Sequence, residues 1–313
     1  MRYLTSIILI LVITATVLFV SYFAVDRGLR QFYSGRYEKF DEMFNRTNYY
    51  DVLLLGSSRT HRNIDPRICD SIAGVSFYNG GISGAEGFEM DAALQGYLEV
   101  HPSPKYVILN YDLGVLSSEK RLYNPIFYYY FLNNKAVYNA VADTDKFTWL
   151  YKHFPFMQYL RFNDDIRIEA IKGIMGKHYT FDSNYKGYSR MEETIGKFDT
   201  TYLHRDSLKY EVRNNDYLNN IINTCRQKDI NLIFFVGPVY NHHFDKKYAD
   251  YSSIIKSSNL FAKENNIPFI RFDSIPLNTS SDNFSDNIHL SEVGSKIFSL
   301  ILVEKLKFYL KDY

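Results

Sequence analysis

The sequence lacks several features that would place it in a specialised class of protein. Its 313 residues include only two cysteines, Cys69 and Cys225, which excludes a disulfide scaffold or a cysteine-rich metal domain and leaves open a single bridge. The 36 Lys and Arg balance the 35 Asp and Glu, and the net charge of +1 argues against a nucleic-acid-binding protein, which usually has a basic excess. Because hydrophobic residues make up 46% of the chain, we expect an ordinary globular core.

Charge is absent from one long segment near the N-terminus. Leu4 to Phe23 is apolar over twenty residues, and as a helix it would span about 30 Å, the thickness of a bilayer core. A cleaved signal peptide would have a shorter apolar core and a better cleavage site. We therefore predict a single-pass membrane anchor at 1–24 and a juxtamembrane connector at 25–48. Positive charge flanks both ends of the segment, so charge alone does not set its orientation.

After residue 48 the pattern alternates between short apolar runs and amphipathic segments. The predicted strands are 51–55, 75–78, 106–109, 231–236 and 268–272. One predicted helix begins at Asp65-Pro66, and four others span 86–100, 215–228, 248–265 and 291–310. This alternation predicts an α/β domain over 49–313, a three-layer αβα sandwich with a parallel, about five-stranded sheet.

Aromatic residues are abundant, at 17% of the chain, although only one of them is tryptophan. Many of the 28 Tyr and 24 Phe fall between the third and fourth strands, where the alternation pauses. We interpret about 117–205 as a mainly helical insertion. Its aromatic side chains either fill the core of a lid or line a cleft in which sugar rings stack.

Three segments near strand ends carry groups suited to chemistry. A Gly-Ser-Ser sequence at 56–58 follows the first strand, where a hydroxyl would emerge at the strand tip. The Gly-rich loop 79–84 follows the second strand and can direct backbone N–H groups at an anion. Asp286 stands three residues before His289, a spacing at which a carboxylate can orient an imidazole. Each signal is weak by itself, because such residues are common in turns.

Together, the three segments resemble the blocks of the SGNH (GDSL-type) hydrolase superfamily, over residues 51 to about 305. Gly-Ser-Ser stands where that family has Gly-Asp-Ser, and 79–84 matches the family pattern Asn-x-x-Ile-Ser-Gly. The resemblance implies a catalytic triad of Ser58, His289 and Asp286. It also implies an oxyanion hole that includes the backbone of Ser58 and Gly84.

One block departs from the family pattern. The family has Gly-x-Asn-Asp after the third strand, and the Asn completes the oxyanion hole, whereas Gly114 stands at that position here. Losing one oxyanion donor costs about 2.7–4 kcal/mol of transition-state stabilisation. Asn79 and Asn110 are the candidate substitutes. Arg59, which follows the expected nucleophile, either reads an anionic group of the substrate or forms a structural ion pair.

The Gly-Ser-Ser-Arg variant, the missing Asn and the N-terminal anchor resemble a membrane-anchored subgroup of the superfamily. That subgroup includes the D protein of teichoic-acid D-alanylation and the alginate O-acetylation proteins. The resemblance implies an extracytoplasmic serine esterase or acyltransferase acting on a bacterial cell-envelope polysaccharide. It also implies a multi-span membrane protein as acyl donor if the reaction is a transfer.

Two other functions stay open at this point. One is an inactive scaffold that binds glycan or a membrane acyltransferase, and the other is an anchored esterase that faces the cytoplasm and acts on lipids. We expect no cofactor and no metal site. Adjacent residues His242 and His243 point apart in extended chain, and Asp245 alone does not complete a ligand set.

Overall fold

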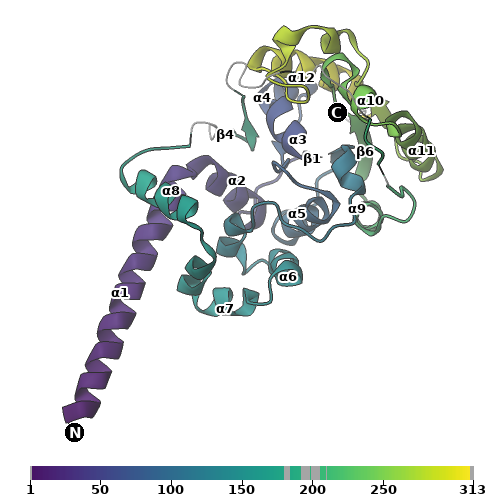
Figure 1. The fold of residues 1–313 in the computed structure, drawn as a ribbon. Coiled ribbons are helices and arrows are strands. Elements are labelled where there is room, and N and C mark those ends of the chain that lie inside the picture. Colours follow the sequence, from purple (N-terminus) through teal and green to yellow (C-terminus); the bar gives the residue numbers. More distant parts are fainter. Residues whose placement is uncertain (1, 180–183, 192–197, 199–204, 209, 311–313) are drawn as a thin grey trace.

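A five-stranded parallel sheet forms the centre of the computed structural model, which describes residues 2–179, 184–191, 198, 205–208 and 210–310 (Figure 1). The strands lie in the order β2-β1-β3-β6-β7. Their bounds are β1 Val52–Leu55, β2 Phe77–Asn79, β3 Tyr106–Asn110, β6 Asn231–Val236 and β7 Phe269–Arg271. A separate antiparallel hairpin consists of β4 Asn184–Tyr185 and β5 Tyr188–Ser189. The predicted α/β class and all five predicted strands are confirmed.

Helices cover both faces of the sheet. The α-helices are α1 Arg2–Phe32, α2 Ser34–Phe44, α3 Ser58–Asn63, α4 Pro66–Ala73, α5 Gly87–Val100, α6 Lys135–Thr144, α7 Thr148–His153, α8 Asp164–Ile174, α9 Asp216–Gln227, α10 His243–Lys247, α11 Tyr251–Glu264 and α12 Glu292–Leu306. The short 3-10 helices are η1 Leu113–Leu116, η2 Pro125–Phe127, η3 Tyr129–Phe131, η4 Pro155–Arg161, η5 Tyr240–His242, η6 Pro276–Thr279 and η7 Ser281–Asn283. As predicted, the Asp65 carboxylate caps α4, with Pro66 in its first turn, and the Ser291 hydroxyl caps α12.

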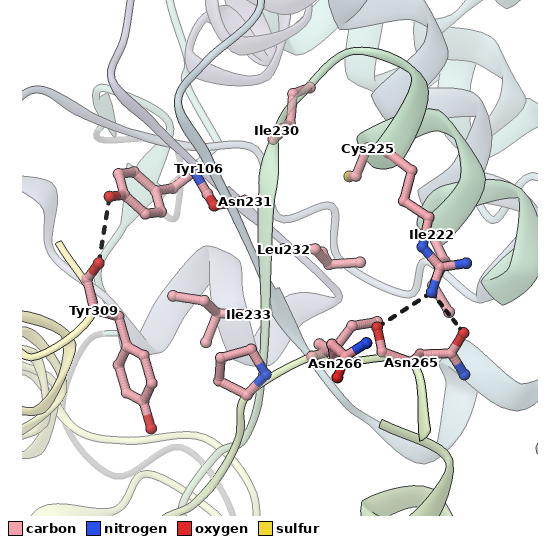
Figure 2. Close-up of a pocket in the computed structure, with 13 residues that line it drawn as sticks. Tyr106, Ile222, Cys225, Ile230, Asn231, Leu232, Ile233, Asn265, Asn266 and Tyr309 are labelled. Atoms are coloured by element: carbon pink, nitrogen blue, oxygen red, sulfur yellow. Dashed lines mark hydrogen bonds between the residues drawn. The ribbon is translucent and has the colours of Figure 1, made fainter. Parts of the chain in front are cut away.

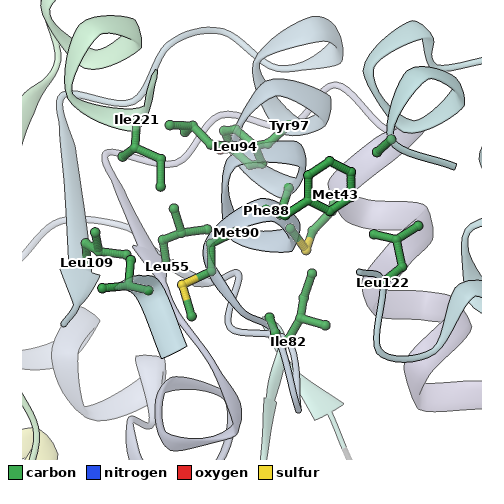
Figure 3. Close-up of a cluster of buried hydrophobic side chains, with 14 of the residues drawn as sticks. Met43, Leu55, Ile82, Phe88, Met90, Leu94, Tyr97, Leu109, Leu122 and Ile221 are labelled. Carbon is green, nitrogen blue, oxygen red and sulfur yellow. The ribbon is translucent and has the colours of Figure 1, made fainter. Parts of the chain in front are cut away.

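The strands are apolar throughout because both faces are buried. In β1, Leu53 and Leu55 belong to the cluster under α2, α5 and α9, whereas Val52 and Leu54 belong to the cluster under α4 and α12. Figure 3 shows Leu55 and Leu109 of neighbouring strands directed towards Met90 and Leu94 of α5. The alternation of side chains along a strand thus sends successive leucines into two separate cores.

The N-terminal helix α1 is continuous from the apolar segment to Phe32. It is the one helix among the described residues that is long and apolar enough to cross a membrane. Its apolar part is exposed, and it projects away from the body, whereas Leu29 and Phe32 are buried (Figure 1). The predicted connector is largely helical: α2 packs Phe40, Met43 and other side chains into the core.

In the described part of the inserted segment, the short helices from η2 to α8 are followed by the β4–β5 hairpin. Tyr128 packs its ring 4.8 Å from Phe40 of α2, and Phe127 lies 5.5 Å from Tyr37. Six of its aromatic side chains are buried in the main core in this way, and four more pack against that core half-buried: Phe127, Tyr128, Tyr129, Phe131, Tyr151 and Phe162, then Tyr130, Tyr138, Tyr159 and Tyr179. Of the two interpretations of the aromatic excess, core filling holds for the buried side chains, and the sugar-stacking cleft stays a prediction for exposed ones such as Tyr123.

The two cysteines do not form a disulfide. Cys69 on α4 and Cys225 on α9 are both buried as free thiols, and they belong to the cores on opposite faces of the sheet. The single bridge that the sequence left open is therefore absent.

Candidate active site

The three segments identified from the sequence meet at the carboxyl edge of the sheet. Ser58 is the first residue of α3, directly beyond β1, and the glycine-rich loop follows β2. His289 and Asp286 lie in the loop before α12, the helix that packs against α3 and α4. Loops from different strands converge at this edge because parallel strands end there together.

Ser58, His289 and Asp286 form a continuous hydrogen-bonded chain. The Ser58 Oγ lies 2.8 Å from His289 Nε2, and His289 Nδ1 lies 2.7 Å from Asp286 Oδ2. The other carboxylate oxygen, Asp286 Oδ1, accepts the backbone N–H groups of Ile288 at 2.8 Å and of His289 at 2.7 Å. The histidine side chain is 17% exposed, so the chain of contacts is open to a substrate from solution.

The protonation of Asp286 sets the tautomer of His289. Burial by itself would raise the pKa of the Asp286 carboxyl, but the hydrogen bond from His289 and the two backbone N–H groups outweigh it and hold the pKa below its usual value. An ionised carboxylate only accepts hydrogen bonds, so His289 Nδ1 carries the proton that is donated to it. His289 Nε2 is then free to accept the proton of the Ser58 hydroxyl.

The neighbouring serine is turned away from the histidine. The Ser57 hydroxyl donates to Asp112 Oδ2, and Asp112 Oδ1 accepts from Arg59 Nη1. Arg59 Nη2 donates to the carbonyls of Gly237 at 2.7 Å and Pro238 at 3.1 Å. Because Arg59 is only 3% exposed, the prediction that it reads an anionic substrate is wrong, and the alternative of a structural ion pair holds.

Backbone N–H groups of Ser58 and Gly84 are the donors available for an oxyanion. No acceptor among the described residues takes either N–H. Gly84 has a positive φ of 79°, and a Cβ there would lie 2.3 Å from the ring of Tyr123. Tyr123 comes from the inserted segment and is half exposed, so one aromatic side chain of the insertion does cover the glycine loop.

The two asparagines proposed as substitute oxyanion donors are both buried. Asn79 Nδ2 donates to the carbonyls of Thr60 at 2.7 Å and Ile64 at 2.8 Å, which uses both amide hydrogens. Asn79 therefore does not serve as an oxyanion donor, and its prediction is wrong. Asn110 lies between Gly56 and Gly237, and its Oδ1 accepts the Gly237 N–H at 3.3 Å. Its role as a donor stays a prediction.

Two buried basic side chains behind the glycine loop were not identified from the sequence. Lys39 of α2 donates to the carbonyl of Gly81 and, at 2.9 Å, to that of Gly187. His61 Nδ1 lies 3.0 Å from the Ser83 Oγ. Burial, followed by the nearby charges of other basic residues, lowers the pKa of both Lys39 and His61 well below the usual values. No local pattern marks them, since their partners are distant in sequence.

A third residue, Asn63, ties α3 to the histidine loop. Its Nδ2 donates to the Ile288 carbonyl at 3.3 Å, and its Oδ1 accepts the Leu290 N–H at 3.0 Å. The backbone is thus held on both sides of His289. Such a clamp fixes the direction in which the imidazole points.

Other cavities and basic residues lie apart from this cluster. A cavity of about 310 Å³ lies at the edge of the sheet where β3 and β6 begin, and Figure 2 shows its lining residues, among them Tyr106, Asn231 and Asn265. That edge is opposite to the one that carries Ser58. His242 is exposed and His243 is buried, and the described residues contain no group of three metal-binding side chains.

Comparisons with known proteins found matches among solved structures. No family model and no curated protein matches the chain. A protein from Desulfitobacterium hafniense, provisionally described as a lipolytic protein of the G-D-S-L family, is 11% identical, with a TM-score of 0.41 and coverage of 82% of this chain and 99% of its own. One from Bacteroides fragilis, provisionally described as an acylhydrolase, is 11% identical, with a TM-score of 0.40 and coverage of 87% and 94%.

A third structure, from Streptococcus pneumonia, is provisionally described as a platelet activating factor. It is 12% identical, with a TM-score of 0.44 and coverage of 95% of this chain and 99% of its own. The neighbours of this chain among solved structures are GDSL-like lipolytic and acylhydrolase proteins.

Proposed function

We propose that this protein is a serine esterase or acyltransferase anchored in a membrane by α1. The single observation that carries the proposal is the hydrogen-bonded chain from Asp286 through His289 to Ser58. A nucleophile, a base and a group that orients the base are the parts that acyl transfer through a covalent intermediate needs. The same three residues were expected from the motifs.

In the proposed mechanism, the Ser58 Oγ attacks the carbonyl carbon of an acyl ester while His289 Nε2 takes the hydroxyl proton. The N–H groups of Ser58 and Gly84 stabilise the negative oxygen of the tetrahedral intermediate. As the ester bond breaks, His289 returns the proton to the leaving alcohol, and the acyl group remains on Ser58. Water or a sugar hydroxyl then gives its proton to His289 Nε2 and attacks the acyl carbon; as the bond from that carbon to the Ser58 Oγ breaks, His289 returns the proton to the Ser58 Oγ.

For the substrate we propose an acylated polysaccharide of the bacterial cell envelope, with the body of the protein outside the cytoplasmic membrane. The anchor-like α1 and the resemblance to the envelope-modifying subgroup support this assignment. If the acyl group goes to a sugar, a multi-span membrane protein would supply it, because a single helix provides no path for an acyl group across the bilayer.

The test compares two adjacent serines in the full chain, purified in detergent. We expect Ser58→Ala to abolish turnover of a small acetyl ester and labelling by a fluorophosphonate probe. Ser57→Ala is the matched control and should keep both, because the Ser57 hydroxyl faces Asp112. Equal acetyl-ester rates for Ser58→Ala and the unchanged protein would exclude the assignment. Turnover with and without a glycan acceptor separates transfer from hydrolysis.

A second candidate is a scaffold without catalytic activity that binds glycan. The commitment of the Asn79 amide to Thr60 and Ile64 favours it, because this removes one of the two substitute oxyanion donors. The scaffold predicts no fluorophosphonate labelling of Ser58 in the folded, unchanged protein. The esterase predicts stoichiometric labelling that Asp286→Asn greatly slows, because the histidine tautomer is no longer fixed.

A further inference from the structure

Exposed apolar side chains gather where α1 leaves the body of the protein. The outer face of α8 presents Ile168, Ile171, Ile174 and Met175, which we call the α8 stripe. Phe147, Trp149 and Phe154, in and beside α7, form a second group, the α7 aromatics. All seven side chains are between 43% and 68% exposed. Single exposed apolar residues are common on protein surfaces. Two groups of them on either side of α1 are unusual and require an explanation.

Contacts with α1 fix where the two groups lie. The η4 segment, which follows α7, meets α1 at Tyr22, the end of the apolar run: the Tyr159 hydroxyl donates to the Tyr22 carbonyl at 3.3 Å. Helix α8 meets α1 a few residues later, where Gly173 lies directly against Gly28. Figure 1 shows α7 and α8 on the side of the body from which α1 projects.

This position is the level of a membrane surface if α1 spans the bilayer. From Tyr22 to Gly28 a helix rises about 9 Å, which is comparable to the polar layer between hydrocarbon and water. The buried face of α8 is occupied by Ala170 and Gly173 against α1, so its stripe points away from the protein. The stripe and the α7 aromatics would therefore meet lipid rather than water.

The charges around these side chains fit the same surroundings. Between residues 146 and 178 there are six Lys and Arg and only three Asp and Glu. Lys146 lies 5.2 Å and Arg161 5.8 Å from the ring of Phe147. Trp and Phe mixed with basic side chains are typical of the headgroup layer, where anionic lipids attract the cations.

We propose that the α8 stripe and the α7 aromatics form a second membrane-contact surface, which holds the body against the bilayer that α1 crosses. The occupant of this surface is lipid with anionic headgroups. The proposal requires α1 to span the membrane, but it does not depend on any catalytic activity. Without this contact, α1 and the body packed on it could tilt in the bilayer as one unit, whereas the contact fixes the tilt and thus the direction in which the Ser58 edge opens.

The one tryptophan of the chain provides the measurement, because Trp149 belongs to the proposed surface. The full chain is reconstituted into vesicles of phosphatidylcholine and phosphatidylglycerol that carry bromine near the headgroup end of the acyl chains. We expect a blue-shifted emission and a loss of fluorescence to bromine. The matched control carries Trp149→Phe with Phe308→Trp, which moves the indole to an exposed position near the C-terminus. It should emit as in water and lose no fluorescence.

A second pair of variants tests the α8 stripe. In the Trp149 background, Ile168→Asp should decrease the quenching by bromine, and Leu260→Asp on the distant helix α11, which is equally exposed, should leave it unchanged. Emission as in water for Trp149 in the vesicles would overturn the proposal. So would a blue shift that depends on protein concentration and persists in detergent, because it would identify a second copy of the chain as the occupant.

Discussion

Single side chains decide the chemistry of this site by the direction in which they turn. Ser57 and Ser58 are adjacent and chemically identical, yet one hydroxyl faces Asp112 and the other faces His289. Arg59 turns inward with Ser57, because its guanidinium completes the environment of Asp112. The glycine loop 79–84 is likewise held from behind, by Lys39 and His61.

Replacing Lys39 by methionine should slow catalysis without unfolding the protein. Lys39 does not touch a substrate at Ser58; it acts through the Gly81 carbonyl on the loop that carries Gly84. We expect Lys39→Met to lower kcat by roughly 10- to 100-fold, since displacements of about 1 Å have effects of this size, with KM little changed. Lys186→Met is the control, because Lys186 lies in the β4–β5 hairpin next to Gly187, the second partner of Lys39, but its ammonium group pairs with Asp70 instead. Equal kcat for the two variants would exclude a positioning role.

The buried Glu89 should make stability fall as pH rises. Burial raises the pKa of Glu89 to about 7. The hydrogen bonds that the Glu89 carboxylate accepts from the Tyr123 N–H and the Tyr128 hydroxyl offset part of this rise. The folded state therefore binds a proton that the unfolded state has lost, and stability decreases between about pH 4.5 and pH 7 and then levels off. In Glu89→Gln this group no longer titrates, so we expect the free energy of unfolding to lose up to roughly 3 kcal/mol less than in the unchanged protein over this pH range.

Urea unfolding of both proteins at several pH values measures this effect. The exposed Glu119 provides the control, since Glu119→Gln should keep the pH dependence of the unchanged protein. Parallel curves for Glu89→Gln and the unchanged protein would contradict the prediction.

Among the helices, α1 and α2 join the apolar N-terminal segment to the α/β body. The two helices are consecutive, and α2 carries Lys39, the residue that contacts the glycine loop. On the other side, α8 crosses α1 at a point where both helices have small residues. Gly28 and Gly173 are required there, because a Cβ on either would overlap the backbone of the other helix.

Gly173→Ala should therefore separate α8 from α1. The added Cβ would lie 1.8 Å from the Gly28 carbonyl oxygen, so the backbones must move apart. Overpacking of this kind costs about 1–3 kcal/mol, and we expect a lower unfolding midpoint and faster proteolysis between α7 and α8. Gly114→Ala is the matched control: its Cβ would have its nearest neighbour at 3.5 Å, an ordinary contact. Unchanged proteolysis of Gly173→Ala would show that the crossing can relax.

At the scale of the whole molecule, one apolar helix and one α/β body share a continuous N-terminal segment. The body packs against α1 up to Tyr22 through η4 and α8, so the junction has little freedom to bend. If α1 spans a membrane, the side on which the body lies decides which class of substrate can reach Ser58.

Cysteine labelling can determine the orientation, because both native thiols are buried. Burial raises the pKa of Cys225 to about 12 and that of Cys69 further, so neither should react. In intact bacterial cells, we expect an impermeant maleimide to label Leu260→Cys on α11. Tyr3→Cys, at the other end of α1, should be labelled only after the cells are opened. The reverse pattern would place the body in the cytoplasm and favour a lipid esterase.

The sequence by itself determined the parts of this protein that depend on local patterns. Short apolar runs that alternate with amphipathic segments indicated the strands, because a strand buried on both faces has few polar positions. The Asp286-x-x-His289 spacing allowed the carboxylate to reach the imidazole within one turn of chain. The Ser58 hydroxyl was expected at a strand end for the same local reason.

Only the tertiary structure decided which polar groups turn inward. Arg59 contacts Gly237, and Lys39 contacts Gly187, across more than a hundred residues of sequence. Asn79 donates its amide hydrogens to carbonyls of α3 and the residue after it, and aromatic side chains such as Tyr128 of the inserted segment fill the core under α2. Such outcomes follow from which buried donors find acceptors after the chain has folded, and no local pattern contains that information.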